Sequence, residues 1–272
     1  MIVNCFLAGC AGVLGCLVGG TPAFIMLGLA GIISFTMASC GLDNTWFQNN
    51  VVNLMLLPAI IFDGDVVGVA YTAKKHKNIN GYDTWRSLAY TNDSMVLFVG
   101  FITGVLCYLF FSLVSYLNVP CDCGALTVLS AGILTRLFLS TGDKVKKDGL
   151  TILEKLPKNV WLFQIFYSAA ISCVFAYFTE ITGNYTIGFY VSALSLILIL
   201  VDANFPVSHH ITLVVGYTMM MTHNYVLAVI FGILAQLMCY AFTIIWNDKC
   251  STHIDPPTVP ILFFSFILFT FF

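Results

Sequence analysis

The sequence contains long apolar runs that carry no charged side chain. Three of them, residues 95–117, 160–178 and 225–246, lack Asp, Glu, Lys and Arg throughout. A helix needs about 20 apolar residues to cross the hydrocarbon core of a bilayer, because it rises about 1.5 Å per residue. These runs therefore predict membrane-spanning helices.

The composition extends this prediction to the rest of the chain. Charged residues make up 9 % of the 272 residues and hydrophobic residues 59 %. Soluble domains carry about 25 % charged and roughly 45–50 % apolar residues. A soluble fold of this size could not cover its surface with so few charges. The composition thus excludes a soluble enzyme, a disordered chain and a nucleic-acid-binding protein.

We predict an all-α fold, a polytopic bundle of about ten short spans that forms a single integral membrane domain, residues 1–272. Gly19 and Pro22 interrupt the first apolar stretch, because glycine permits a tight turn and proline breaks a helix interior. Residues 1–36 therefore form two short spans or a re-entrant hairpin. The last run, residues 259–272, reaches only roughly 20 Å and need not cross fully. The other expected spans are residues 51–73, 95–117, 125–140, 160–178, 187–201, 211–222 and 225–246.

The basic residues indicate which loops face the cytoplasm. With ten alternating spans, all lysines and arginines fall in the loops 74–93, 141–159 and 247–258, or near one of them, as Arg136 does. The loops on the other side carry acidic residues but no basic residue. Because cytoplasmic loops are enriched in Lys and Arg, we expect these three loops on the cytoplasmic side. The pattern is typical of a multi-pass protein of the bacterial cytoplasmic (inner) membrane.

Two carboxyl groups, Asp63 and Asp65, interrupt the third expected span. A carboxylate at the centre of a membrane helix costs ~2.5–3.5 kcal/mol on insertion scales, so such groups face a cavity or a partner and are functional by default. On an intact helix, residues two apart point about 200° from one another. Gly64 and Pro58 favour a broken helix, which would let both carboxyl groups face one cavity. We expect a cation site or a proton-coupling pair. The alternative is a shorter span, in which the pair lies in a wet vestibule and only caps a helix.

Histidines gather on the expected cytoplasmic side. His209 and His210 precede the span 211–222, and His253 and Asp255 precede the last run on a loop that two prolines hold extended. A fixed imidazole and carboxylate suit a gate or a proton relay, and by ligand type a transition-metal site. No HxxxH or CxxC spacing accompanies them, so the metal stays unknown. Solvated loop histidines are the alternative.

A few further polar groups lie within the expected spans. Arg136 can pair with the acidic pair or snorkel to the cytoplasmic surface, and its place near the loop favours snorkelling. Asn53, Gln164 and Gln236 can line a path for an ion, or they can hydrogen-bond neighbouring helices. We include Asn53 and Gln236 among the candidate binding residues.

Small residues recur at helical spacing and predict close helix packing. Gly100 and Gly104 have GxxxG spacing, and Ala8 with Gly12 has the looser small-xxx-small form. Such pairs let helix backbones approach each other. The spacing alone does not tell packing within the chain from packing in a homo-oligomer.

The sequence also hints at an internal repeat. Residues 132–138 resemble residues 232–238, and both segments would run from outside to inside, as in a parallel repeat. An alphabet dominated by Leu, Ile, Val and Phe also produces such matches by chance, so a duplication stays open.

The function that fits these observations best is a secondary transporter or channel, a permease for a small solute or ion. No P-loop, GxSxG or HExxH motif is present, so we expect no enzyme activity, no cofactor and no nucleic-acid partner. The expected partners are the bilayer, a small solute or ion and, as an open possibility, further copies of the chain. Transport would be coupled to protons or cations. The candidate binding residues are Asp63, Asp65, Asn53 and Gln236, and the candidate cytoplasmic gate or relay is His209, His210, His253 and Asp255.

Two other classes stay open. One is an intramembrane enzyme that acts on a lipid-type substrate with the histidines and aspartate of the cytoplasmic face. The other is a non-catalytic scaffold subunit of a membrane complex, in which the small-residue stripes would matter more than the acidic and histidine side chains.

Overall fold

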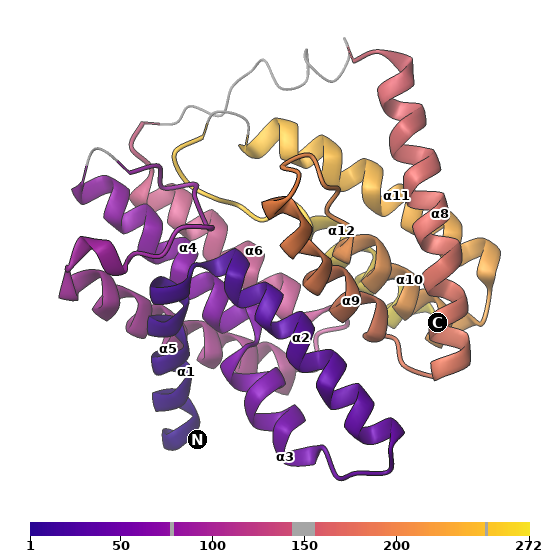
Figure 1. Ribbon diagram of the computed structural model, residues 1–272, viewed down its shortest axis with the longest axis horizontal. Coiled ribbons are helices and arrows are strands. Elements are labelled where there is room, and N and C mark those ends of the chain that lie inside the picture. The colour runs from indigo at the N-terminus through magenta and orange to yellow at the C-terminus, as the bar shows by residue number, and fades with distance from the viewer. Residues whose placement is uncertain (77–78, 143–155, 248–249) are drawn as a thin grey trace. The chain divides into compact units, whose positions relative to one another are not determined.

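The computed structural model describes residues 1–76, 79–142, 156–247 and 250–272. The chain divides into two compact units (Figure 1). Unit 1 contains helices α1 to α6 and residues 250–255, and unit 2 contains helices α8 to α12 and residues 120–122. Within the described ranges every regular element is a helix, which confirms the predicted all-α class.

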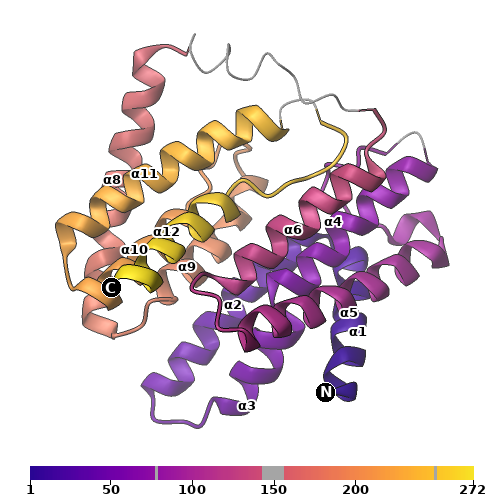
Figure 2. The same cartoon turned by 180° about the vertical axis from the view of Figure 1, so that it is seen from behind.

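Helix α4 lies at the centre of unit 1. It spans Pro58–Lys75 and packs against α1 (Ile2–Val18), α2 (Gly20–Ser39), α5 (Ser94–Tyr116) and α6 (Cys123–Leu139) (Figure 2). Most residues of α4 are buried, whereas most residues of α5 are only partly buried or exposed. A membrane helix that is surrounded by other helices shields its polar groups from lipid. The surroundings of α4 therefore allow carboxyl groups at its centre.

The chain enters α4 through irregular helix. A short α3 (Thr45–Phe47) continues into a π-helical stretch, η1 (Gln48–Met55), and α4 begins at Pro58. Proline is favoured in the first turn of a helix, because the backbone N–H that it lacks has no partner inside the helix there. The break therefore falls at Leu56 and Leu57.

The expected break at Gly64 is wrong, because α4 is continuous through this residue. Gly64 serves close packing instead: a Cβ atom added there would lie 2.5 Å from Cα of Gly12 in α1. The absence of a side chain lets the two helix backbones touch.

The first apolar stretch forms two helices, as expected. Gly19 separates α1 from α2 with φ of 94°, a conformation that glycine adopts without steric cost. Pro22 lies in the first turn of α2, so it does not interrupt a helix.

The small-residue stripes pack α1 against α5. A Cβ atom added to Gly12 would lie 2.1 Å from the carbonyl oxygen of Gly100, and one added to Gly104 would lie 2.2 Å from that of Ala8. The predicted close approach is confirmed, and its partners lie within one unit of one chain. These stripes therefore act in intramolecular packing.

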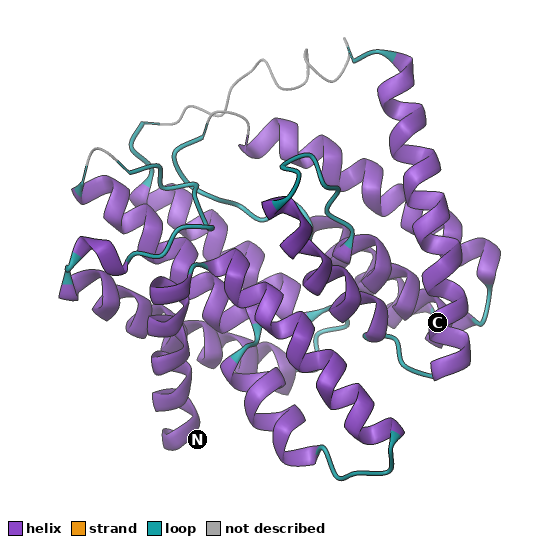
Figure 3. Ribbon diagram, in the orientation of Figure 1, coloured by secondary structure: helices purple, strands orange, loops and turns teal. Residues whose placement is uncertain are grey.

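Unit 2 is built around three helices that pack against one another, α8 (Lys158–Thr182), α10 (His209–Thr222) and α11 (Tyr225–Phe242) (Figure 3). Helix α9 (Ile187–Ser195) contacts α8 and α10, and α12 (Thr258–Phe271) contacts α10 and α11. Two helices continue irregularly, α9 as the 3₁₀ stretch η3 (Leu196–Leu200) and α11 as the π stretch η4 (Thr243–Asn247).

Among the described residues, five helices are long and apolar enough to cross a membrane, and four apolar helices are shorter. This supports an integral membrane protein, while the ten-span arrangement and the sides of the loops stay predictions. Several lysines that underlie the predicted sides lie outside the described residues: Lys77, Lys144, Lys146, Lys147, Lys155 and Lys249. The five long helices are Gly20–Ser39, Thr45–Lys75, Ser94–Tyr116, Lys158–Thr182 and Tyr225–Asn247.

Candidate functional site

The carboxyl groups of Asp63 and Asp65 are fully buried inside unit 1. Because α4 is an intact helix at this point, the two side chains point to different neighbours. Oδ2 of Asp65 accepts a hydrogen bond of 2.8 Å from the backbone N–H of Gly20, the first residue of α2. The first N–H groups of a helix have no partner within it and carry partial positive charge. Asp65 thus stabilises the start of α2.

Asp63 has poorer partners. Neither of its carboxyl oxygens accepts a hydrogen bond from any described atom of the protein. The thiol of Cys107 in α5 lies beside it, but not in a geometry that satisfies either oxygen, and Asp255 is close enough to act on it electrostatically. A buried polar group without a partner costs about 1–3 kcal/mol, and a buried charge costs more. The buried carboxyl group of Asp63 therefore lowers the stability of unit 1.

Residues 250–255 cover this part of α4. The imidazole of His253 lies 5.7 Å from the ring of Phe62 and 5.0 Å from the ring of Tyr82, measured between ring centroids. Its Nε2 atom lies 3.5 Å from Oδ1 of Asp255, and both side chains are mostly buried. Since Asp255 also acts electrostatically on Asp63, the structure brings three of the predicted residues near one another: Asp63, His253 and Asp255.

Arg136 holds this segment against α6. Its Nε atom donates to Oγ1 of Thr252 at 3.0 Å, and its Nη2 atom donates to the carbonyl oxygen of the same residue. Gly132, one turn earlier in α6, lies close to Cα of Ile254. Arg136 thus links α6 to residues 250–255, and its expected snorkelling to the membrane surface stays a prediction.

The other predicted binding residues lie elsewhere. Asn53 is exposed on η1, where its Oδ1 atom accepts a hydrogen bond of 3.0 Å from Nε2 of Gln48. It does not contribute to the buried surroundings of Asp63. Gln236 belongs to unit 2, together with the expected gate residues His209 and His210.

Unit 2 contains a hydrogen-bonded chain of three polar side chains. Nε2 of Gln236 donates to Oε1 of Gln164, and Oε1 of Gln236 lies 2.6 Å from Nε2 of His210. The amide oxygen can only accept, so His210 carries a proton on Nε2. His210 is buried, and His209 packs its ring edge against Phe189. The two histidines are therefore part of the protein interior rather than a solvated loop.

A charged cluster lies at the end of α4. Asp93 caps the N-terminus of α5 by accepting a hydrogen bond from the N–H of Met95. Its carboxylate also pairs with Nζ of Lys75 and Nε2 of His76. The hydrogen bond from Lys75, followed by that from His76, lowers the pKa of the Asp93 carboxyl. Asp93 is therefore a charged anchor between the two helices.

Sequence reasoning missed Cys107, because a cysteine in an apolar run resembles a small hydrophobic residue. Its spacing could have indicated its place: it follows Gly100 by two helical turns, so both lie on the buried face of α5. Among the described residues, no group of three or more His, Cys, Asp or Glu side chains is arranged to hold a metal ion.

Comparison with known proteins places the chain in one family. No curated protein and no solved structure matches it. The sequence profile described as "Family of unknown function (DUF7973)" matches it twice, over residues 1–149 and over residues 140–271. Together the two matches cover nearly the whole chain. The chain therefore belongs to the Family of unknown function (DUF7973).

Proposed function

We propose that this protein is a secondary transporter or channel for a small solute or ion, and that its transport is coupled to protons or cations at Asp63. The observation that carries this proposal is the fully buried carboxyl group of Asp63, which has no hydrogen-bond partner among the described residues. Ionisable groups at such positions in membrane helices are expensive and mark paths of ions and protons. Binding of an ion or a proton would offset the unfavourable free energy of burying this carboxyl group without a partner.

The residues near Asp63 could control how protons or ions reach it from one side of the membrane. His253 and Asp255 form a mostly buried pair, and Arg136 fixes the segment that carries them. An imidazole and a carboxylate can pass protons on, or open and close a path when their charges change. In this proposal they act as a gate or relay for Asp63, while Asp65 holds α2 in place.

The proposal is tested by charge movement and pH change in proteoliposomes that contain the full-length protein. A panel of ions and small metabolites is applied to wild type, Asp63→Asn and the control Asp43→Asn, which changes an exposed acidic residue. We expect one class of solute to give a signal that Asp43→Asn keeps and Asp63→Asn loses. A solute-dependent signal of unchanged size and ion dependence in Asp63→Asn would contradict the proposal.

A further inference from the structure

We propose that the ion coupled at this site is a proton, carried by Asp63 alone, and that Asp65 does not take part. This inference rests on the proposed function and names its coupling ion. Metal cations that bind oxygen need several oxygen ligands around them. Membrane transporters supply such oxygens from the unwound backbone of discontinuous helices. A proton needs only one carboxyl oxygen.

The backbone of α4 supplies no free carbonyl groups at this place. The helix is continuous from Pro58 to Lys75, so the carbonyls around Asp63 are engaged in its own hydrogen bonds. The carbonyl of Gly64 additionally accepts from the thiol of Cys16, at 3.3 Å. The polar atom that α5 places beside Asp63 is sulfur, which is a poor ligand for hard cations. The described surroundings thus lack an oxygen cage.

The two carboxyl groups differ in how they are held. Oδ2 of Asp65 accepts the N–H of Gly20, and this bond holds the carboxyl group in place, although Oδ1 of Asp65 has no hydrogen-bond partner among the described atoms. Asp63 has no such donor. Asp255 is close enough to Asp63 to act on it electrostatically, and His253 lies beside Asp255, so two further protonatable groups lie near Asp63. The geometry therefore separates a fixed acid from an exchanging one.

Other titratable groups near Asp63 come from most of the elements that pack on α4. Helix α2 contributes none near this point. The described groups are Cys16 of α1, Asp65 of α4, Asp83 of the following loop, Cys107 of α5, Arg136 of α6, and His253 and Asp255 of residues 250–255.

Infrared spectroscopy of the full-length protein in lipid tests the choice of ion without any transported solute. The C=O stretching band of a protonated carboxyl group is followed as a function of pH in wild type, Asp63→Asn and Asp65→Asn. We expect a titrating band that Asp63→Asn removes and Asp65→Asn keeps. We also expect the same midpoint in sodium, potassium and choline salts.

Competition by a metal cation would overturn the proposal. If sodium shared the site with the proton, each tenfold increase in its concentration would lower the midpoint by about one pH unit once the site is saturated. A titrating band that Asp65→Asn removes instead would also overturn it. Sodium competition would leave ion-coupled transport at Asp63 intact, whereas undisturbed transport in Asp63→Asn would contradict the proposed function itself.

We also infer, from separate observations, that the chain is a duplication whose two copies cross the membrane in opposite directions. The family profile matches both halves. Gly100 is followed by Cys-Tyr-Leu-Phe at residues 107–110, and Gly232 is followed at the same spacing by Cys-Tyr-Ala-Phe at residues 239–242. The resemblance between residues 132–138 and 232–238 is shorter, so Gly100 is the better counterpart of Gly232.

The packing within each unit agrees with this correspondence. A Cβ atom added to Gly100 would lie 2.8 Å from the carbonyl oxygen of Gly12 in α1, the first helix of unit 1. A Cβ atom added to Gly232 would lie 2.0 Å from Oγ of Ser172 in α8, the first described helix of unit 2. In both units the same glycine thus packs against the first helix.

The turns before these two helices also correspond. Asn92 (φ 49°) precedes the capping residue Asp93 of α5, and His223 (φ 49°) precedes the capping residue Asn224 of α11. In each turn the hydroxyl of a threonine, two residues before the capping residue, accepts a hydrogen bond from the backbone N–H of that capping residue. Left-handed backbone is uncommon for residues other than glycine, so its recurrence at this place supports a common origin.

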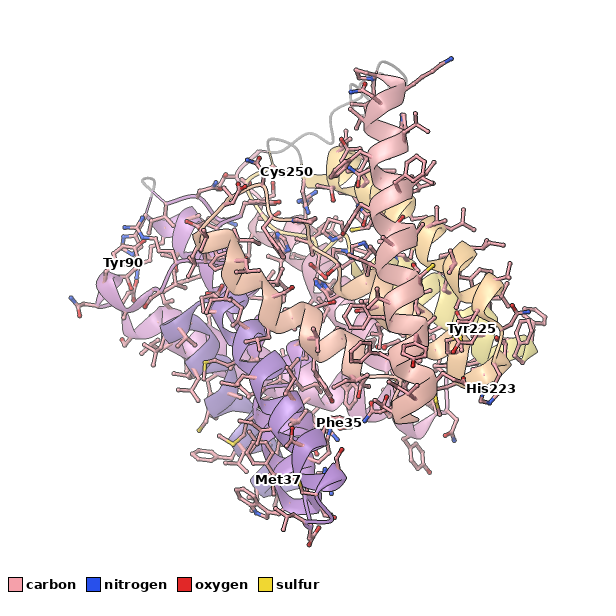
Figure 4. All side chains as sticks on the ribbon, turned by 45° about the vertical axis from the view of Figure 1, so that its right-hand side comes forward. Phe35, Met37, Tyr90, His223, Tyr225 and Cys250 are labelled. Carbon is pink, nitrogen blue, oxygen red and sulfur yellow. The ribbon has the colours of Figure 1, made fainter. Side chains whose placement is uncertain are left out.

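Among the described residues, five helices of the first copy (α1, α2, α4, α5 and α6, with the three-residue α3 set aside) correspond to five of the second (α8 to α12). If each helix crosses once, an odd number of crossings makes the second copy begin on the opposite side. The turn at Asn92 would then be cytoplasmic and the turn at His223, whose exposed side chain Figure 4 labels, would be external.

Epitope tags inserted after Asn92 and after His223 of the full-length chain test this topology. Antibody binding is compared in intact and permeabilised cells. We expect the tag after His223 to be accessible in intact cells and the tag after Asn92 only after permeabilisation. A second pair of tags, inserted after Gly41 and after Asn204, lies behind the second helix of each copy. This pair gives the same test if a tag of the first pair prevents folding. Accessibility of both members of a pair from the same side would overturn the inversion.

Discussion

Oδ2 of Asp65 lies 2.8 Å from the backbone nitrogen of Gly20, although the two residues belong to different helices and are 45 positions apart. The contact joins the centre of a buried helix to the first turn of α2. It gives Asp65 a structural role that differs from the role proposed for Asp63, two residues earlier.

Replacing Asp65 should therefore affect stability according to whether the acceptor is kept. Asp65→Ala leaves the N–H of Gly20 buried without a partner, which costs about 1–3 kcal/mol. Asp65→Asn keeps an oxygen that can accept and should cost less. Thermal unfolding in detergent measures both variants. Equal stability of the two would contradict the assigned hydrogen bond.

Adding a methyl group to the contact between α1 and α5 should destabilise the protein. A Cβ atom at residue 104 would lie 2.2 Å from the carbonyl oxygen of Ala8, so Gly104→Ala must separate the helices. Overpacking of this kind costs typically about 1–3 kcal/mol. Leu106→Ala, at an exposed position of the same helix, is the control for thermal unfolding. A Gly104→Ala variant no less stable than this control would show that the backbones do not touch.

The stability contributed by Asp93 should depend on pH. Lys75 and His76 lower the pKa of this carboxyl in the folded protein below its value in the unfolded chain. The contribution is therefore fully present above the unfolded pKa and is lost as pH falls through the folded pKa. The melting temperature of wild type should exceed that of Asp93→Asn near neutral pH, and the difference should shrink on acidification. A difference that is independent of pH would contradict this account.

Removing the central amide of the polar chain in unit 2 should destabilise that unit. Gln236→Leu removes the amide that bonds both the half-buried Gln164 and the buried His210, and losing a hydrogen-bond partner of a buried group costs about 1–3 kcal/mol. The double variant Gln164→Leu, Gln236→Leu should recover part of the loss, because it removes an orphaned amide. Hydrogen exchange of α10 and α11 measures the effect. Additive losses in the double variant would argue against one connected chain.

The helices were predictable because each long apolar run in the sequence corresponds closely to one helix. The run at residues 95–117 became α5 (Ser94–Tyr116), and the glycine at position 19 ended α1. The sequence predicted the helix break at Gly64, several residues after its actual place before Pro58, because a glycine can mark either a break in a helix or a close contact between helices. Only the contact with Gly12 decides between them.

The candidate site was predictable in part. The rarity of charge in the chain pointed to Asp63, and the prolines after Asp255 pointed to a fixed loop. The partners of these groups depend on tertiary packing, which brings residues 250–255 to α4 across most of the chain length. The spacing of Cys107 from Gly100 could have placed its thiol on the buried face of α5, but it does not indicate that Asp63 lies beside this thiol.

The measurement that tests the central claim most directly compares gradient-driven accumulation with solute exchange in proteoliposomes. Wild type should accumulate its solute against a concentration gradient when a pH gradient is imposed. If Asp63 couples transport to the ion, Asp63→Asn should still exchange internal for external solute but should no longer accumulate it. Accumulation by Asp63→Asn to the level of wild type would contradict the account.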